Sequence, residues 1–130
     1  MLQAHPEVGE TRVAVQRALA RMSSRRKNSA LEAMALELEA RRQAIQDANA
    51  KDMEAGRASG LSAALMDRLL LTDARIDAMS KGLRDVAGLK DPVGAKISKW
   101  VRPNGIEILK VRVPLGVIAI IYESRPNVTA

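Results

Sequence analysis

The sequence predicts an α/β chain in which N-terminal helices are followed by a β-hairpin arm and by the first strand of a further domain that is incomplete in this chain. Apolar residues recur at helical spacing over the first two thirds, and Asn104-Gly105 separates two alternating, β-branched segments. Residues 117–121 are continuously apolar. We therefore expect a helical region over 1–93, a hairpin arm over 94–113 and the start of an α/β domain over 114–130.

The helical region begins with one apolar face and continues with a long helix. The first face lies at positions i, i+3, i+4 and i+7, and Ser23 and Ser24 then provide a break and an N-cap. The segment 25–60 is rich in good helix formers and should form one helix that ends between Gly56 and Gly60. The apolar positions of these two helices are Val15, Ala18, Leu19 and Met22, followed by Leu31, Met34, Leu38 and Ile45.

Two further helices complete the region. "LSAALMDRLL" predicts a short helix that Ser62 caps. "TDARIDAMSKGLRDVAG" predicts the last helix, which begins at Thr72. Asp73 lies in its first turn, where a negative charge suits the helix dipole. Gly88 should end this last helix, and "KDPVG" predicts a turn. The predicted buried stripe of the last helix consists of Ile76, Met79, Leu83 and Val86.

The hairpin arm consists of "KISKWV" and "IEILKVRV", which "RPNG" separates. Asn104 and Gly105 both tolerate positive φ, so they predict the turn. Neither face of the second strand is cleanly polar. The arm therefore either lies against another domain or subunit or forms an edge hairpin within one domain.

The apolar run after the arm predicts a strand that is covered on both faces, as in a parallel sheet. Its four large side chains would each gain about 1.5–3 kcal/mol on burial. No other segment of the sequence is a good parallel partner, so we expect the chain to stop within a sheet-forming domain.

Composition excludes several classes of function. The sequence has no cysteine, which excludes disulfides, a thiolate metal site and a cysteine nucleophile within these residues. Its net charge is +6, but acidic residues are interspersed among the basic ones, and aromatic residues that could stack on bases make up only 2%. Nucleic acid is therefore the least favoured partner. No apolar run approaches a membrane span and the first residues lack a secretory pattern, so we expect a cytoplasmic protein.

The residues that could carry chemistry follow the predicted strand, in "YESRPN". Ligands of open parallel sheets bind beyond the carboxyl ends of strands. Arg125 can hold a phosphate or carboxylate through its planar fork, and Asn127 can donate an amide hydrogen bond to an oxyanion. Pro126 fixes the backbone between them. The alternative is a structural turn in which Asn127 or Thr129 caps the next helix.

The other polar residues of the sequence are weaker candidates for a functional site. His5 is the only histidine, and a metal site would need further ligands, so no metal is expected. The basic cluster "RMSSRRK", residues 21–27, is an exposed corner between helices or an anion site. Glu123 is a solvated or arginine-paired carboxylate, or an acid or base whose partner the sequence does not reveal.

The segment "VRVPLGVIAIIYESRPNVTA" closely resembles the signature of the γ-glutamyl phosphate reductase family, also called glutamate-5-semialdehyde dehydrogenase, within the aldehyde dehydrogenase superfamily. "ANAKD", "GLS", "DRLLLT" and "LKDPVG" resemble motifs of the N-terminal region of that family, in the same order. The resemblance implies that the strand opens an aldehyde-dehydrogenase-like cofactor-binding domain. It covers nearly the whole chain, which would correspond to roughly the first third of the enzyme.

The resemblance implies a reaction. In the family, γ-glutamyl phosphate is reduced with NADPH to glutamate 5-semialdehyde and phosphate, in the second step of proline biosynthesis. A cysteine far downstream attacks the acyl phosphate, and hydride then reduces the thioester. This chain has no cysteine, so alone it should be inactive. The alternative is a non-enzymatic helical assembly module that another chain completes.

The resemblance also implies site residues and partners. Asn127 would be the catalytic oxyanion ligand, although an ungapped alignment with the wider superfamily places Arg125 there instead. The turn beside the nicotinamide would be formed by Tyr122, Glu123, Ser124, Arg125 and Pro126. The family further implies a homo-oligomer and a contact with glutamate 5-kinase, with no membrane or nucleic acid among its partners.

Overall fold

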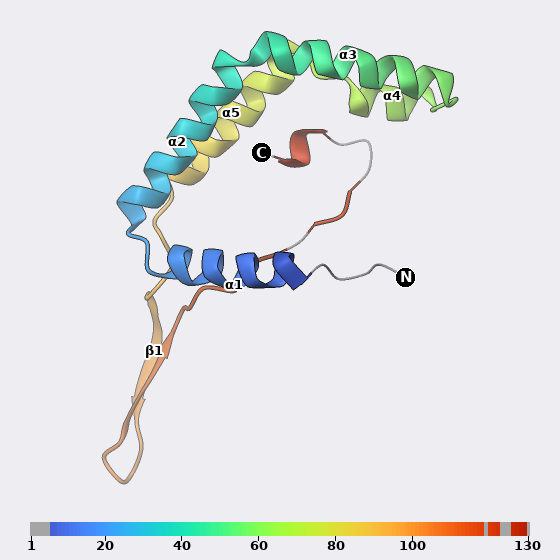
Figure 1. Ribbon diagram of the computed structural model, residues 1–130. Coiled ribbons are helices and arrows are strands. Elements are labelled where there is room, and N and C mark those ends of the chain that lie inside the picture. Colours follow the sequence, from blue (N-terminus) through green and yellow to red (C-terminus); the bar gives the residue numbers. More distant parts are fainter. Residues whose placement is uncertain (1–5, 119, 123–125, 130) are drawn as a thin grey trace. The chain divides into compact units, whose positions relative to one another are not determined.

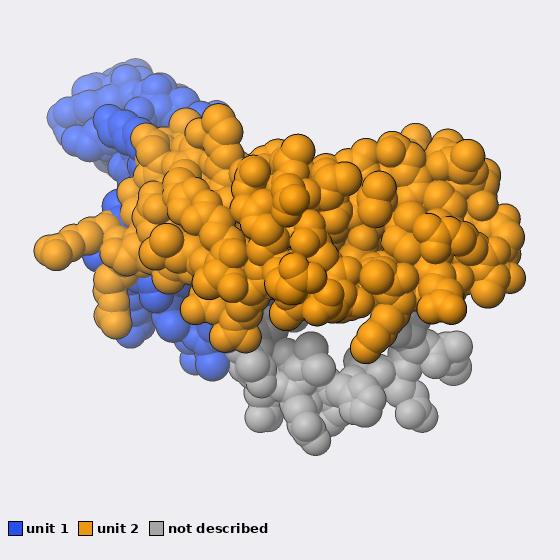
Figure 2. All heavy atoms as spheres, turned by 90° about the horizontal axis from the view of Figure 1, so that it is seen from above, with its two compact units in different colours: residues 1–24, 90–119 blue, residues 25–89, 120–130 orange. Residues whose placement is uncertain are grey.

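The structure is a computed structural model that describes residues 6–118, 120–122 and 126–129. The chain divides into two compact units, which are coloured separately in Figure 2. Unit 1 comprises Met1–Ser24 with Lys90–Ala119, and unit 2 comprises Arg25–Leu89 with Ile120–Ala130. Each unit therefore joins segments that are distant in the sequence.

Unit 2 contains four α-helices that pack in pairs. They are α2 (Ser24–Ala40), α3 (Arg42–Ala58), α4 (Ala63–Leu69) and α5 (Asp73–Ala87). Helix α5 runs alongside α2, and α4 runs alongside α3 (Figure 1). The small hydrophobic core consists of Ala35, Met53, Leu71, Ile76, Leu83 and Ala87.

The prediction of one helix over 25–60 is wrong, because α2 and α3 are separate helices that meet at Arg41. The backbone of Arg41 has φ −100° and ψ 16°, outside helical geometry, although neither glycine nor proline marks the position. Glu39, just before the break, pairs with Arg84 near the end of α5. Arg42, just after it, pairs with Asp73 at the start of α5. The break is therefore accompanied by tertiary ion pairs that hold each half to a different part of α5.

The predicted N-caps of α4 and α5 are confirmed. Ser62 Oγ accepts a hydrogen bond from the Leu65 N–H, and Thr72 Oγ1 accepts one from the Arg75 N–H. Helix α3 ends as predicted near Gly60, where φ is +76°, and Leu61 N–H donates back to the Gly56 carbonyl at 3.0 Å. Gly88 is the C-cap of α5.

The buried stripe of α5 differs from the prediction at its C-terminal end. Ile76 and Leu83 are buried as predicted and Met79 is half-buried, but Val86 is 53% exposed. Ser80 and Ala87 are buried instead. Of these two small residues, Ser80 contacts α2, where its hydroxyl lies 3.3 Å from the Ala35 carbonyl oxygen.

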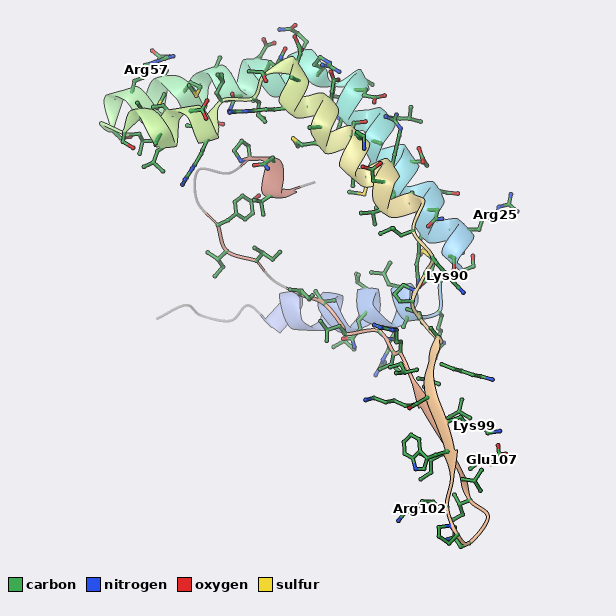
Figure 3. All side chains as sticks on the ribbon, turned by 180° about the vertical axis from the view of Figure 1, so that it is seen from behind. Arg25, Arg57, Lys90, Lys99, Arg102 and Glu107 are labelled. Carbon is green, nitrogen blue, oxygen red and sulfur yellow. The ribbon has the colours of Figure 1, made fainter. Side chains whose placement is uncertain are left out.

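Unit 1 contains α1 (Pro6–Ala20) and the predicted hairpin, formed by β1 (Lys96–Val101) and β2 (Glu107–Val111). The strands are antiparallel, with Trp100 opposite Ile108. Gly105 closes the turn at φ +82°. An ion pair of 2.8 Å joins Lys99 to Glu107 across the strands. Figure 3 labels both residues on the hairpin. The predicted face of α1 is largely exposed, since Val15 and Leu19 are 45% and 47% accessible.

The predicted strand over 117–121 is not formed by its described residues, and Ala119 lies outside them. Ile118, Ile120 and Ile121 expose 66%, 67% and 99% of their surface. No strand among the described residues pairs with this segment, so its backbone has no ladder to join. The helical character of the N-terminal region and the hairpin are confirmed, although residues 25–60 form two helices. The apolar run has no strand beside it among the described residues.

Within the described part of the chain, no helix is both long and apolar enough to cross a bilayer.

Candidate functional site

Unit 2 contains a cavity of about 500 Å³ between the end of α4, one face of α5 and the 3₁₀-helix η1 (Pro126–Thr129). Two arginines and one asparagine provide its polar groups, and the other described lining residues are apolar or small. The lining residues are Arg68, Leu70, Leu71, Arg75, Ala78, Met79, Gly82, Pro126, Asn127 and Val128. The described lining thus carries two positive charges and no carboxylate.

The first arginine, Arg75, is held by the end of α4. Its Nη2 lies 3.0 Å from Asp67 Oδ2, and its Nη1 donates to the Leu70 carbonyl at 2.8 Å and to the Asp67 carbonyl. Asp67 therefore compensates the charge of Arg75. Arg75 thus serves to join α5 to the last turn of α4.

The second arginine, Arg68, differs from Arg75 in its partners. No hydrogen bond or ion pair joins its side chain to another residue in the described ranges. The backbone on either side of it is fixed, because the Asp67 carbonyl accepts from Arg75 and the Leu69 carbonyl accepts from Asn49. Arg68 therefore brings an uncompensated cation to the cavity from a well-anchored position.

Two of the sequence-predicted site residues, Pro126 and Asn127, lie at this cavity. Pro126 is half-buried and Asn127 is exposed, and η1, to which both belong, contacts α5. Tyr122 is 44% exposed. The predictions for Glu123, Ser124 and Arg125 fall outside the described residues, as does the prediction for His5. The structure thus brings Asn127 to the same cavity as Arg68 and Arg75.

Sequence reasoning missed Arg68 as a candidate site residue. It also assigned Met79 to the core stripe and gave Gly82 no role, although both line the cavity. A signal was present in "MDRLLLT", where the charged pair Asp67-Arg68 interrupts an apolar segment just before a helix cap. No local pattern of residues predicts that η1 lies beside this face of α5.

The α4–α5 connection that borders the cavity is positioned by Asn49 of α3. Its Nδ2 donates to the Leu69 carbonyl at 2.8 Å, and its Oδ1 accepts from the Leu71 N–H at 2.8 Å. Asn49 is only 4% exposed, so these backbone groups have no ready substitute in water. Asn49 belongs to the "ANAKD" motif, so this motif has a structural role in the chain.

A polar cluster outside the cavity joins α2 to α5. Ser80 Oγ lies 2.6 Å from Glu39 Oε1, and Arg84 contacts both carboxylate oxygens of Glu39 at 2.6 and 2.9 Å. Hydrogen bonds from Arg84 and then from Ser80 lower the pKa of Glu39 to about 2. Every member of the cluster is satisfied by the others, which indicates a structural role.

The basic corner over 21–27 contains Ser24, whose hydroxyl lies 3.0 Å from Asp91 Oδ2. Among the residues that the structure describes, no cluster of three histidine, cysteine or acidic side chains could hold a metal ion.

The chain is similar to a class of reductases that are considerably longer than it is. The particular proteins to which it is similar are γ-glutamyl phosphate reductases. The enzyme of Rhodospirillum rubrum is 56% identical over 124 residues, which is 95% of this chain and 29% of that protein. The enzyme of Moorella thermoacetica is 59% identical over 113 residues, or 87% of this chain and 27% of that protein. No protein-family model matches the chain.

Solved structures agree with the sequence comparison. The crystal structure of γ-glutamyl phosphate reductase from Thermotoga maritima is 50% identical with a TM-score of 0.81, covering 88% of this chain and 28% of that one. The enzyme from Saccharomyces cerevisiae is 28% identical with a TM-score of 0.90, covering 99% of this chain and 33% of that one. The resemblance to the N-terminal region of γ-glutamyl phosphate reductase is thus confirmed. The chain spans about 29% of the length of its curated relatives.

Proposed function

We propose that the chain serves as the N-terminal part of an NADPH-dependent reductase. This enzyme would convert L-γ-glutamyl 5-phosphate to L-glutamate 5-semialdehyde and phosphate, the second step of proline biosynthesis. The observation that carries the proposal is the 56% identity to a γ-glutamyl phosphate reductase over 95% of the chain. The cavity of unit 2 supports it, because a positively charged hollow favours an anionic substrate.

Within this proposal, the cavity is one wall of the active site. Asn127 would donate its side-chain amide to the oxyanion that forms when the acyl group is attacked. Tyr122 and Pro126 would form one edge of the nicotinamide site, with the predicted contacts of Glu123, Ser124 and Arg125 beside them. The partly exposed ring of Tyr122 and the half-buried ring of Pro126 suit a flat, apolar cofactor face. NADPH would supply the hydride.

The role of Asn127 is tested in the complete product of the gene that carries this sequence. Asn127→Ala should lower kcat by about 10²–10³-fold, as for the loss of one oxyanion donor. Asn28→Ala, on α2 and outside the cavity lining, is the control. Equal kcat values for the two variants would remove Asn127 from the catalytic machinery.

The 130-residue chain by itself should be inactive, because it contains no cysteine to attack the acyl phosphate. The measurement is NADPH consumption in the presence of γ-glutamyl phosphate, for the purified chain and for the complete gene product. Turnover by the chain alone would contradict the cysteine-dependent mechanism. Absence of turnover by the complete gene product would contradict the proposed function.

The second candidate is an assembly module, and the exposed apolar residues of unit 1 favour it. Ile97 and Trp100 of β1 are 51% and 44% exposed, and Ile106 beside the turn is 57% exposed. Single apolar residues are common on surfaces, but several on one hairpin favour a covering partner. A homo-oligomer that covers the hairpin fits both candidates, and light scattering measures it. A well-folded monomer at all concentrations would count against the assembly module.

A further inference from the structure

We infer that Arg68 binds an anionic group of the substrate, either its carboxylate or its phosphate. This inference rests on the proposed function and extends it to Arg68, to which neither the sequence predictions nor the relatives' names assign a role. Arg68 lies in the last turn of α4 and lines the same cavity as Asn127.

The described lining of the cavity is positively charged. Its described lining contains two arginines and no acidic residue. Asp67 compensates Arg75 through two carboxylate contacts of 3.0 and 3.1 Å. Arg68 has no such partner in the described ranges, so the net positive charge of the cavity resides on its guanidinium.

Arg68 differs from the arginines that join the helices of unit 2 to one another. Arg42 pairs with Asp73 and Asp77, and Arg84 pairs with Glu39. These pairs join helices to one another and account for their arginines structurally. Arg68 joins nothing within the described structure, so packing of the unit does not explain it.

The backbone on both sides of Arg68 is held in place by hydrogen bonds. Its neighbours on both sides are held through their carbonyls, Asp67 by Arg75 and Leu69 by Asn49. Helix α4 is further held against α3, where a Cβ on Gly56 would lie 3.0 Å from Met66 Sδ and 3.3 Å from Leu69 Cδ2. A fixed backbone lowers the entropy that the arginine loses when it binds a ligand.

The cavity matches the proposed substrate in size and in charge. A cavity of about 500 Å³ lies within the range of small-molecule sites. The proposed substrate carries an anionic group at each end, a phosphate and an α-carboxylate. If Asn127 binds the reacting acyl oxygen, Arg68 faces one of these anions across the same cavity. The planar fork of arginine suits either group through two parallel hydrogen bonds.

The experiment uses the complete gene product in the reverse direction. There the semialdehyde is oxidised, NADP⁺ is reduced to NADPH, and inorganic phosphate forms the new acyl-phosphate bond. The two anions then belong to two separate reactants, phosphate and the carboxylate-bearing semialdehyde. Arg68→Gln should raise the KM of one reactant by about 10–100-fold, as expected for loss of charge-assisted hydrogen bonds.

Matched variants separate binding from structure. Arg57→Gln is the control, because Arg57 is also exposed, lies near the end of α3 outside the cavity lining, and extends away from the helix in Figure 3. Arg68→Lys keeps the charge and loses the fork, so its KM should lie between those of the wild type and of Arg68→Gln. Thermal denaturation of every variant reports folding.

Each outcome decides the inference. A raised KM for phosphate identifies the phosphate as the group that Arg68 binds, and a raised KM for the semialdehyde identifies the carboxylate. If both KM values match those of Arg57→Gln, or if only the melting temperature falls, Arg68 is a surface or structural residue and the inference is wrong. If only this inference is wrong, the wild-type enzyme still turns over its substrate. If the wild-type enzyme itself is inactive, the proposed function is wrong.

Discussion

The side-chain oxygen of Asn49 accepts a hydrogen bond of 2.8 Å from the backbone N–H of Leu71, and both residues are buried. The amide nitrogen of Asn49 donates to the Leu69 carbonyl, so one side chain replaces two missing backbone partners. The connection between α4 and α5 is thereby fixed to α3. Because Arg68 and Arg75 flank this connection, the shape of the cavity depends on Asn49.

Removal of this side chain should destabilise the chain. Asn49→Ala leaves a part-buried carbonyl and a buried N–H without partners, and a buried unpaired group costs about 1–3 kcal/mol. We expect a loss of about 2–4 kcal/mol in the free energy of unfolding, measured by urea denaturation. Lys51→Ala, an exposed position on the same helix, should change it by less than about 0.5 kcal/mol. Equal effects of the two variants would contradict the role of Asn49.

Two helical glycines should respond oppositely to substitution. A Cβ on Gly82 meets nothing within 4 Å, so Gly82→Ala should stabilise α5 by about 0.5–1 kcal/mol. A Cβ on Gly56 would lie 3.0 Å from Met66 Sδ and 3.1 Å from Leu61 Cδ1, so Gly56→Ala should lose most of that gain. The larger Gly56→Val should cost about 1–3 kcal/mol. Thermal denaturation of the three variants checks the order, and a stabilised Gly56→Val would refute the close packing of α4.

Acid should weaken the contact between α2 and α5. The folded chain holds the pKa of Glu39 at about 2, below the value of about 4.3 for an unfolded glutamate. A depressed folded pKa contributes stability that is complete above the unfolded pKa and is lost as pH falls through the folded one. The melting temperature should therefore fall between about pH 5 and pH 2. Glu39→Gln should flatten this dependence, whereas the exposed Glu54→Gln should not.

The hairpin turn should require glycine at position 105. Gly105 has φ +82°, where a β-carbon costs about 1–2 kcal/mol, whereas asparagine tolerates this region better. Gly105→Val should therefore accelerate hydrogen exchange of the Arg102 N–H, which donates to the Ile106 carbonyl at 2.9 Å. Gly105→Asn should leave that exchange closer to the wild type. Identical protection in both variants would show that the turn conformation is not limiting.

Much of the local structure could be predicted from the sequence because its signals are local. Ser62 and Thr72 cap the helices that they precede, since a cap depends only on the next few residues. Asn104-Gly105 predicts the hairpin for the same reason. The motifs also sufficed to predict the resemblance to γ-glutamyl phosphate reductase, which the comparisons confirm.

Only the tertiary structure decided where α2 ends and which residues line the cavity. Helix propensity is uniform through Arg41, and ion pairs to α5 accompany the break there. Val86 fits the helical period but is exposed, whereas Ser80 and Ala87 are buried, and Ser80 contacts Ala35 and Glu39 of α2. Arg68 and Asn127 lie far apart in the sequence and line one cavity because η1 contacts α5. Such contacts depend on segments brought together by folding, and no local pattern of residues encodes them.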